Sequence, residues 1–154
     1  MFERTSGKKV VITAPRMDVK TGEGSVMFRY HLPGKSSVSI SSQEQGNEFD
    51  GSAHLHHGVL EIYTMHEGVL LLAVETPGGI IDVKRLTVTG LCTYVVEPGV
   101  PHMAYKYKGA VFTVQKIGVP VPNENRRGND WYAVDVTWMN DAIEVIQRHI
   151  VSDT

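Results

Sequence analysis

The sequence is poor in several features that would point to particular protein classes. Its single cysteine, Cys92, cannot form an internal disulfide and lies in an apolar run, where a buried thiol is expected. The 15 Lys and Arg residues nearly balance the 17 Asp and Glu residues, so no broad attraction to nucleic acid or to anionic membranes is expected. The longest apolar run, residues 68–74, is too short to cross a bilayer, and the N-terminus lacks the apolar core of a secretory signal. We therefore expect a cytoplasmic protein whose partner is neither nucleic acid nor a membrane.

A length of 154 residues favours one domain that is large enough to bury its own core. We expect N-terminal strands in residues 1–50 and a core in 51–118 that carries the motifs described below. A loop, a strand and a helix are expected in 119–154. Hydrophobic residues make up 42% and charged residues 21%, as in an ordinary globular protein.

Strand signals dominate this sequence. Short segments rich in Val, Ile, Thr, Tyr and Phe alternate with Gly and Pro breakers, a pattern that predicts an all-β sandwich or barrel. The predicted strands are 9–14, 25–32, 37–41, 59–65, 69–75, 80–88, 93–96, 103–106, 110–117 and 131–137. The polar stretch 46–52 is expected to be a mobile connection, and 119–130 a charged loop containing Arg126 and Arg127.

Only the C-terminus has a helical period. Apolar residues recur there at three- and four-residue steps, which predicts one amphipathic helix over 140–151, with Asn140 or Asp141 as its N-terminal cap. We expect this helix to close one end of the barrel or to join a dimer contact.

Four of the seven histidines lie between positions 54 and 66, and a carboxylate follows at Glu61. Strand alternation places His54 and His56 on one face and sends His57 to the other. Glu61 follows His56 by five positions, so it can join the same side only if the strand breaks near Gly58. A later histidine, His102, follows a Pro-Gly turn and Pro101. Imidazoles and a carboxylate that converge on one point are the usual ligands of a divalent transition metal.

The run His54-x-His56-x4-Glu61-x6-Gly68 resembles the first motif of the cupin superfamily, and Pro98-Gly99-x-x-His102 resembles the second. Three positions depart from the family pattern. Glu48 stands in place of a Gly, Glu97 in place of a Pro and Lys106 in place of an Asn.

The resemblance implies an antiparallel jelly-roll barrel with one short C-terminal helix. It also implies that His54, His56, Glu61 and His102 hold a metal inside the barrel. A set of three imidazoles and one carboxylate suits Mn, Fe, Co, Ni, Cu or Zn, and it does not choose among them. Tyr63, Tyr105 and Phe112 are candidates for lining the cavity, whereas Lys106 and Lys108 are expected to face water. No catalytic residue can be named from the sequence.

Two classes of function remain open. The first is a metal-dependent enzyme acting on a small polar metabolite, either an isomerase or epimerase of a sugar-like substrate or a dioxygenase. The second is a non-catalytic cupin that senses a small molecule. Strand signals in the first fifty residues exceed what the motifs need, which predicts a homodimer formed through them.

Overall fold

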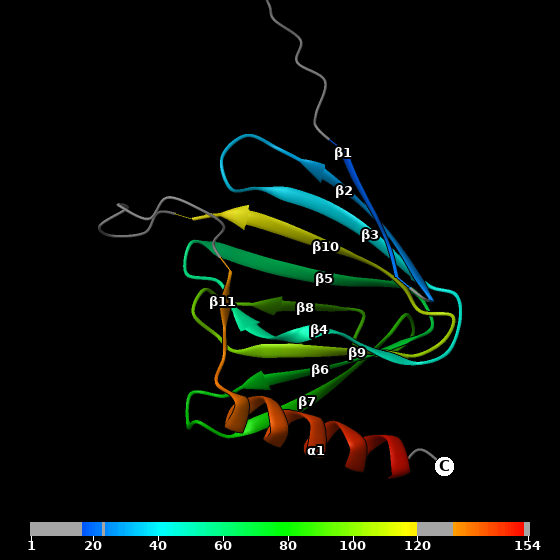
Figure 1. Cartoon of the computed structure of the whole chain (residues 1–154), viewed down its shortest axis with the longest axis vertical. Helices are drawn as coiled ribbons and strands as arrows, with labels where there is room; N and C mark the ends of the chain where they lie inside the picture. The colour runs from blue at the N-terminus through cyan, green and yellow to red at the C-terminus, as the bar shows by residue number, and fades with distance from the viewer. Residues whose placement is uncertain (1–16, 23, 120–130, 153–154) are drawn as a thin grey trace, which may run out of the picture.

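Two antiparallel β-sheets and one helix make up the computed structural model, which describes residues 17–22, 24–119 and 131–152 (Figure 1). We call the larger sheet A; its order is β1-β2-β3-β10-β5-β8. Its strands are β1 (Met17–Thr21), β2 (Ser25–His31), β3 (Ser37–Gln43), β10 (Val111–Gly118), β5 (Val59–Glu67) and β8 (Thr93–Val96). Sheet B has the order β11-β4-β9-β6-β7. Its strands are β11 (Tyr132–Ala133), β4 (Glu48–Leu55), β9 (His102–Lys106), β6 (Val69–Glu75) and β7 (Ile81–Thr87).

The two sheets form a jelly roll, so the predicted fold class is confirmed. The chain crosses from sheet A to sheet B at Gly68, between β5 and β6. Gly68 has φ +71°, and a Cβ atom there would lie 2.8 Å from the Cα of Ala110. Only glycine fits this crossing, because it tolerates both the left-handed backbone and the close approach.

Apolar residues pack in two layers. The first layer lies between the sheets and includes Leu70, Leu72 and Phe112. The second lies between sheet B and the helix α1 (Val136–Ser152), whose Ala142 and Ile146 are fully buried (Figure 1). β6 is therefore buried on both faces.

The helix begins four residues earlier than expected, at Val136 instead of 140. The cap is Asp135, whose Oδ1 accepts a hydrogen bond from the backbone N–H of Trp138 at 2.9 Å. This cap converts part of the expected strand 131–137 into helix and leaves only the two-residue β11. No helix in the described parts of the chain combines the length and the apolar character needed to cross a bilayer.

The polar stretch 46–52 was expected to be a connection, but β4 begins within it at Glu48. Phe49 packs edge-on against Tyr105 with ring centroids 4.9 Å apart, which anchors the strand. Lys106 was expected to face water; instead it is buried, with its Nζ 3.1 Å from Glu48 and 3.4 Å from Asp50. Pairing with these two carboxylates lets the cation lie inside the sheet.

Two predictions concern segments outside the described residues, namely the strand expected at 9–14 and residues 120–130 of the expected loop, with Arg126 and Arg127. At the N-terminal edge of sheet A, the strand β1 was not predicted. The outer face of β1, β2 and β3 exposes large apolar side chains, namely Met17, Val19, Phe28, Tyr30 and Ile40.

Candidate metal centre

Four side chains from both sheets meet at one point. His54 lies on β4, His56 just after it, His102 at the start of β9 and Glu61 on β5. One donor atom from each lies within 4.8 Å of those of the other three. The sequence motif therefore brings together the donors that it was expected to bring together.

The local chain path explains this convergence. β4 ends at Leu55 and β5 begins at Val59, so the predicted break near Gly58 is where the chain leaves sheet B for sheet A. Glu61 then shares the inward face of β5 with Tyr63 and Met65, which alternate with less buried neighbours. On the other sheet, His102 pairs directly with His54 in the register of β9 and β4.

Backbone carbonyls fix the tautomers of two of the imidazoles. Nδ1 of His54 lies 2.9 Å from the carbonyl of Ser52, and Nδ1 of His102 lies 2.9 Å from that of Val100. Because a carbonyl only accepts hydrogen bonds, Nδ1 carries the proton in both rings. In the neutral form of either ring the lone pair is therefore on Nε2, as in a metal-ligating histidine held by a carbonyl.

The donor set fits a cation. Nε2 of His102 is buried and makes no aligned hydrogen bond with any described residue, yet it lies 2.6 Å from Oε2 of Glu61. Nε2 of His56 lies 3.1 Å from the other carboxylate oxygen. A nitrogen lone pair and a carboxylate oxygen repel each other at such a distance, and either a proton on Nε2 or a bound cation removes the repulsion. A divalent metal can take the place of the protons, and this set of ligand atoms suits a transition metal.

Electrostatics keep these groups in their metal-binding forms. Burial lowers the pKa of His54 to about 4, and repulsion from His102 adds to the effect, so its ring is neutral at ordinary pH. Burial alone would raise the pKa of Glu61. The contacts with His102 and His56 and the charge of Lys116 outweigh burial and hold that pKa far below its usual range.

Two proton-bearing side chains touch the carboxylate. The hydroxyl of Tyr63 donates to Oε2 of Glu61 at 3.4 Å, and Nζ of Lys116 lies 3.4 Å from Oε1. Burial, with the charge of Glu61, raises the pKa of Tyr63 well above its usual value, so the phenol keeps its proton. The sequence analysis missed Lys116. Period-two counting from Phe112 through Val114 would have placed it on the inward face.

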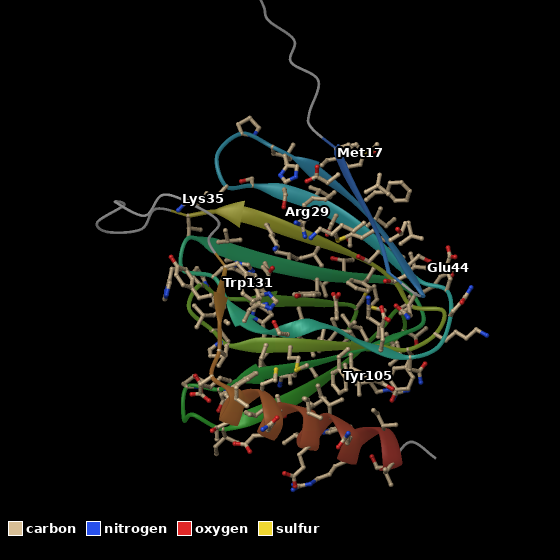
Figure 2. All side chains as sticks on the ribbon, in the orientation of Figure 1. Met17, Arg29, Lys35, Glu44, Tyr105 and Trp131 are labelled. Atoms are coloured by element: carbon tan, nitrogen blue, oxygen red, sulfur yellow. The ribbon has the colours of Figure 1, made fainter. Side chains whose placement is uncertain are left out.

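A cavity of about 670 Å³ opens beside the four donors. Tyr63 and Phe112 line it, as expected. Tyr105 does not: it lies on the opposite face of β9, in the layer that packs on the helix. Alternation from the inward-facing His102 accounts for this correction, because residues 103 and 105 must point outward. Trp131, which the sequence analysis did not single out, lines the cavity and stacks on His54 with ring centroids 5.6 Å apart (Figure 2).

The remaining histidines of the cluster lie away from the donors. His57 is exposed and contacts the ring of Tyr132 at 4.7 Å, as expected for a residue on the other strand face. His66 is exposed, with its Nε2 3.2 Å from the hydroxyl of Thr113. Cys92 is partly buried, and its thiol donates to the carbonyl of Met65 at 3.4 Å.

No protein-family model and no curated protein matches the sequence. Among solved structures, oxalate decarboxylase from Bacillus subtilis at pH 4.6 is 14% identical, with a TM-score of 0.61; the match covers 93% of this chain and 37% of that one. The capsular polysaccharide assembling protein CapF from Staphylococcus aureus, in space group C2221, is 14% identical, with a TM-score of 0.56; the match covers 79% of this chain and 35% of that one. The chain has the cupin fold.

The chain spans well under half the length of either neighbour. At such low identity the likeness concerns the fold, and the donor cluster is an independent observation on this chain. The two agree, since the four donors lie between the sheets of the jelly roll, where the motif resemblance implied a metal.

Proposed function

We propose that this chain is a metal-dependent cupin enzyme that isomerises or epimerises a small, sugar-like metabolite. One observation carries the proposal. Three of the four donors, His54, His56 and Glu61, line a cavity. Its wall also carries hydroxyl and charged groups, including Ser37, Ser39 and Lys116. A polyhydroxylated molecule can exchange its water contacts for such a wall without loss of hydrogen bonds.

The chemistry follows from what borders the centre. His54, His56, Glu61 and His102 would hold the ion, which when bound polarises oxygen atoms of a substrate and eases removal of a proton from the neighbouring carbon. Lys116 and Tyr63 are the proton-bearing groups next to Glu61, at 3.4 Å each. They are the candidates for donating a proton to the substrate oxygen that gains negative charge, while the proton from carbon would pass to water.

Two other functions would use the same centre. A dioxygenase would need a redox-active metal and a substrate that it can oxidise, and the serine-rich wall favours sugar-like molecules over aromatic ones. A metabolite sensor would bind the same ligand without turnover. Metal analysis and turnover assays distinguish these three functions.

Metal binding is the first test. Protein purified without chelator should contain a stoichiometric divalent ion by mass spectrometry of the elements. His102→Ala should weaken affinity at least about 100-fold, because losing a ligand costs no less than losing one of its supporting contacts. His149→Ala, which removes an exposed imidazole from α1, is the matched control and should keep the metal. Full occupancy in His102→Ala would remove this residue from the ligand set.

Turnover is the second test. Aldoses and ketoses incubated with the metal-loaded protein in D₂O should take up deuterium at the carbon next to the carbonyl, which NMR detects. Lys116→Met should slow this exchange by about 10²- to 10⁴-fold if the ammonium group donates a proton to the substrate oxygen, with the metal content unchanged. Sugar binding without any exchange would support the sensor, and oxygen consumption with the same metals would support the dioxygenase.

A further inference from the structure

A polar row leads away from the metal centre across the inner face of sheet A. Glu61 on β5 lies in register with Lys116 on β10, Lys116 with Ser37 on β3, and Ser37 with His31 on β2. The next row of the same face runs through Tyr63, Val114, Ser39 and Arg29. Polar side chains therefore extend along this wall from β5 to β2.

Two serine hydroxyls on this wall have no hydrogen-bond partner among the described residues. The side chains of Ser37 and Ser41 are 6% exposed and line the cavity, and neither makes a hydrogen bond with any residue that the structure describes. Ser39, 4% exposed, has only a long contact of 3.4 Å with the carbonyl of Val114. Buried hydroxyls are normally hydrogen-bonded, so these groups are placed to meet a polar ligand.

Arg29 lies at the far end of the second row. Arg29 lines the cavity, and its Nε is buried without a hydrogen bond to any described residue. Nη2 has one weak contact, 3.8 Å from the sulfur of Met27, and within residues 17–22, 24–119 and 131–152 no carboxylate forms an ion pair with this arginine.

The acids on the cavity wall are already engaged. Asp50 lies 3.4 Å from Nζ of Lys106, and Glu61 belongs to the metal centre. Asp18 stands opposite Arg29 in the register of β1 and β2, but its Oδ2 lies 2.6 Å from Nε2 of His31 and forms no ion pair with Arg29. A half-buried guanidinium with no ion pair to a described carboxylate can bind an oxyanion strongly, because the two planar groups share two parallel hydrogen bonds.

We propose that the cavity takes a hexose-sized polyhydroxylated metabolite that carries an oxyanion, a carboxylate or a phosphate, on the end away from the metal. The inference rests on the proposed function, since the metal centre would hold the other end. Arg29 binds the oxyanion, and Ser37, Ser39 and Ser41 face the hydroxyls between. β2 is three strands from β5, so the Cα atoms of Arg29 and Tyr63 are about 14 Å apart along the sheet at ordinary strand spacing. Inward-pointing side chains at both ends shorten that span to the length of a sugar.

Three probes that differ only at one carbon test this inference. Glucose, glucuronate and glucose 6-phosphate are titrated calorimetrically into the metal-loaded protein. At least one of the two anions should bind about 10- to 100-fold more tightly than glucose, and which one it is tells a carboxylate from a phosphate. Arg29→Gln should bring that ratio close to one, whereas Arg29→Lys should keep part of it. Arg148→Gln, which removes an exposed arginine from α1, should keep the full ratio.

Three results would overturn the inference: an unchanged ratio in Arg29→Gln, equal affinity for glucose and both anions, or no binding of any probe. If Arg29→Gln does not fold, NMR of the wild-type protein decides. The Arg29 Nε–H resonance should shift with the anionic sugar and stay in place with glucose, and an unmoved resonance would overturn the inference. Metal content, measured in the same samples, tests the proposed function separately. An anion preference in protein that takes up no metal would keep this inference and remove the enzyme assignment.

Discussion

Two seven-residue strands face the same interior and have opposite chemistry. On β6, Leu70, Leu72 and Val74 point into the space between the sheets, and the outward residues Leu71 and Ala73 are equally buried under α1. On β3 the inward residues are three serines and Gln43, and the outward Ile40 is 40% exposed. The two strands are therefore buried for different reasons. β6 is part of the apolar core, whereas β3 turns its polar face toward the cavity and its apolar face outward.

The largest loss of stability should come from a substitution in the core strand β6. Leu72→Ala should lower the free energy of unfolding by about 2–5 kcal/mol, because the fully buried side chain leaves a cavity that its neighbours cannot fill. Urea unfolding with a chelator present measures this without any contribution from metal. Ile40→Ala on the exposed face of β3 is the control and should cost clearly less. Equal losses would mean that both strands belong to one core.

Metal bound beside the cavity should stabilise the folded protein. At a free Mn²⁺ concentration about 100 times its Kd, the free energy of unfolding should rise by about 2.7 kcal/mol, because the ion binds the folded donors. Leu72→Ala should gain the same increment, since core packing and ligand binding add when they are independent. Glu61→Gln should gain almost none. The melting curves with and without Mn²⁺ provide the measurement, and an increment in Glu61→Gln as large as in the wild type would contradict the proposed ligand role.

A smaller effect is expected where a charge is buried on β9. Lys106→Met should change the free energy of unfolding by about 1 kcal/mol or less. The methionine replaces the packed stem, and the two carboxylates remain partly in water, with side chains 35% and 47% exposed. Urea unfolding in low salt checks this. A loss above about 3 kcal/mol would mean that Glu48 and Asp50 depend on the cation as a fully buried pair would.

Lys106 also shows which features of the structure could be predicted from the sequence and which could not. Period-two alternation and the spacing of the motif were enough to predict the jelly roll and to place His54, His56, Glu61 and His102 together. Counting outward from His102 would also have placed Tyr105 against the helix and Lys106 inside. The rest depends on contacts between distant segments. Ser39, for example, meets Val114 across 75 residues, and no local pattern specifies such a pairing. The expected homodimer stays a prediction, for which the apolar outer face of β1, β2 and β3 is the surface to examine.

The smallest effect on stability is expected for the inward serines of β3, and it should distinguish β3 from β6 most clearly. Ser37→Ala and Ser41→Ala should each change the free energy of unfolding by no more than about 0.5 kcal/mol, because these hydroxyls lack protein partners among the described residues and none is left unsatisfied by their loss. Both substitutions should nevertheless weaken the binding of glucose 6-phosphate or glucuronate, whichever binds. Unfolding curves and calorimetry on the same preparations compare the two quantities. Weaker binding with unchanged stability would show that these serines contact the ligand. A loss of stability above about 1 kcal/mol with unchanged binding would instead show that the inward face of β3 contributes to the folded core.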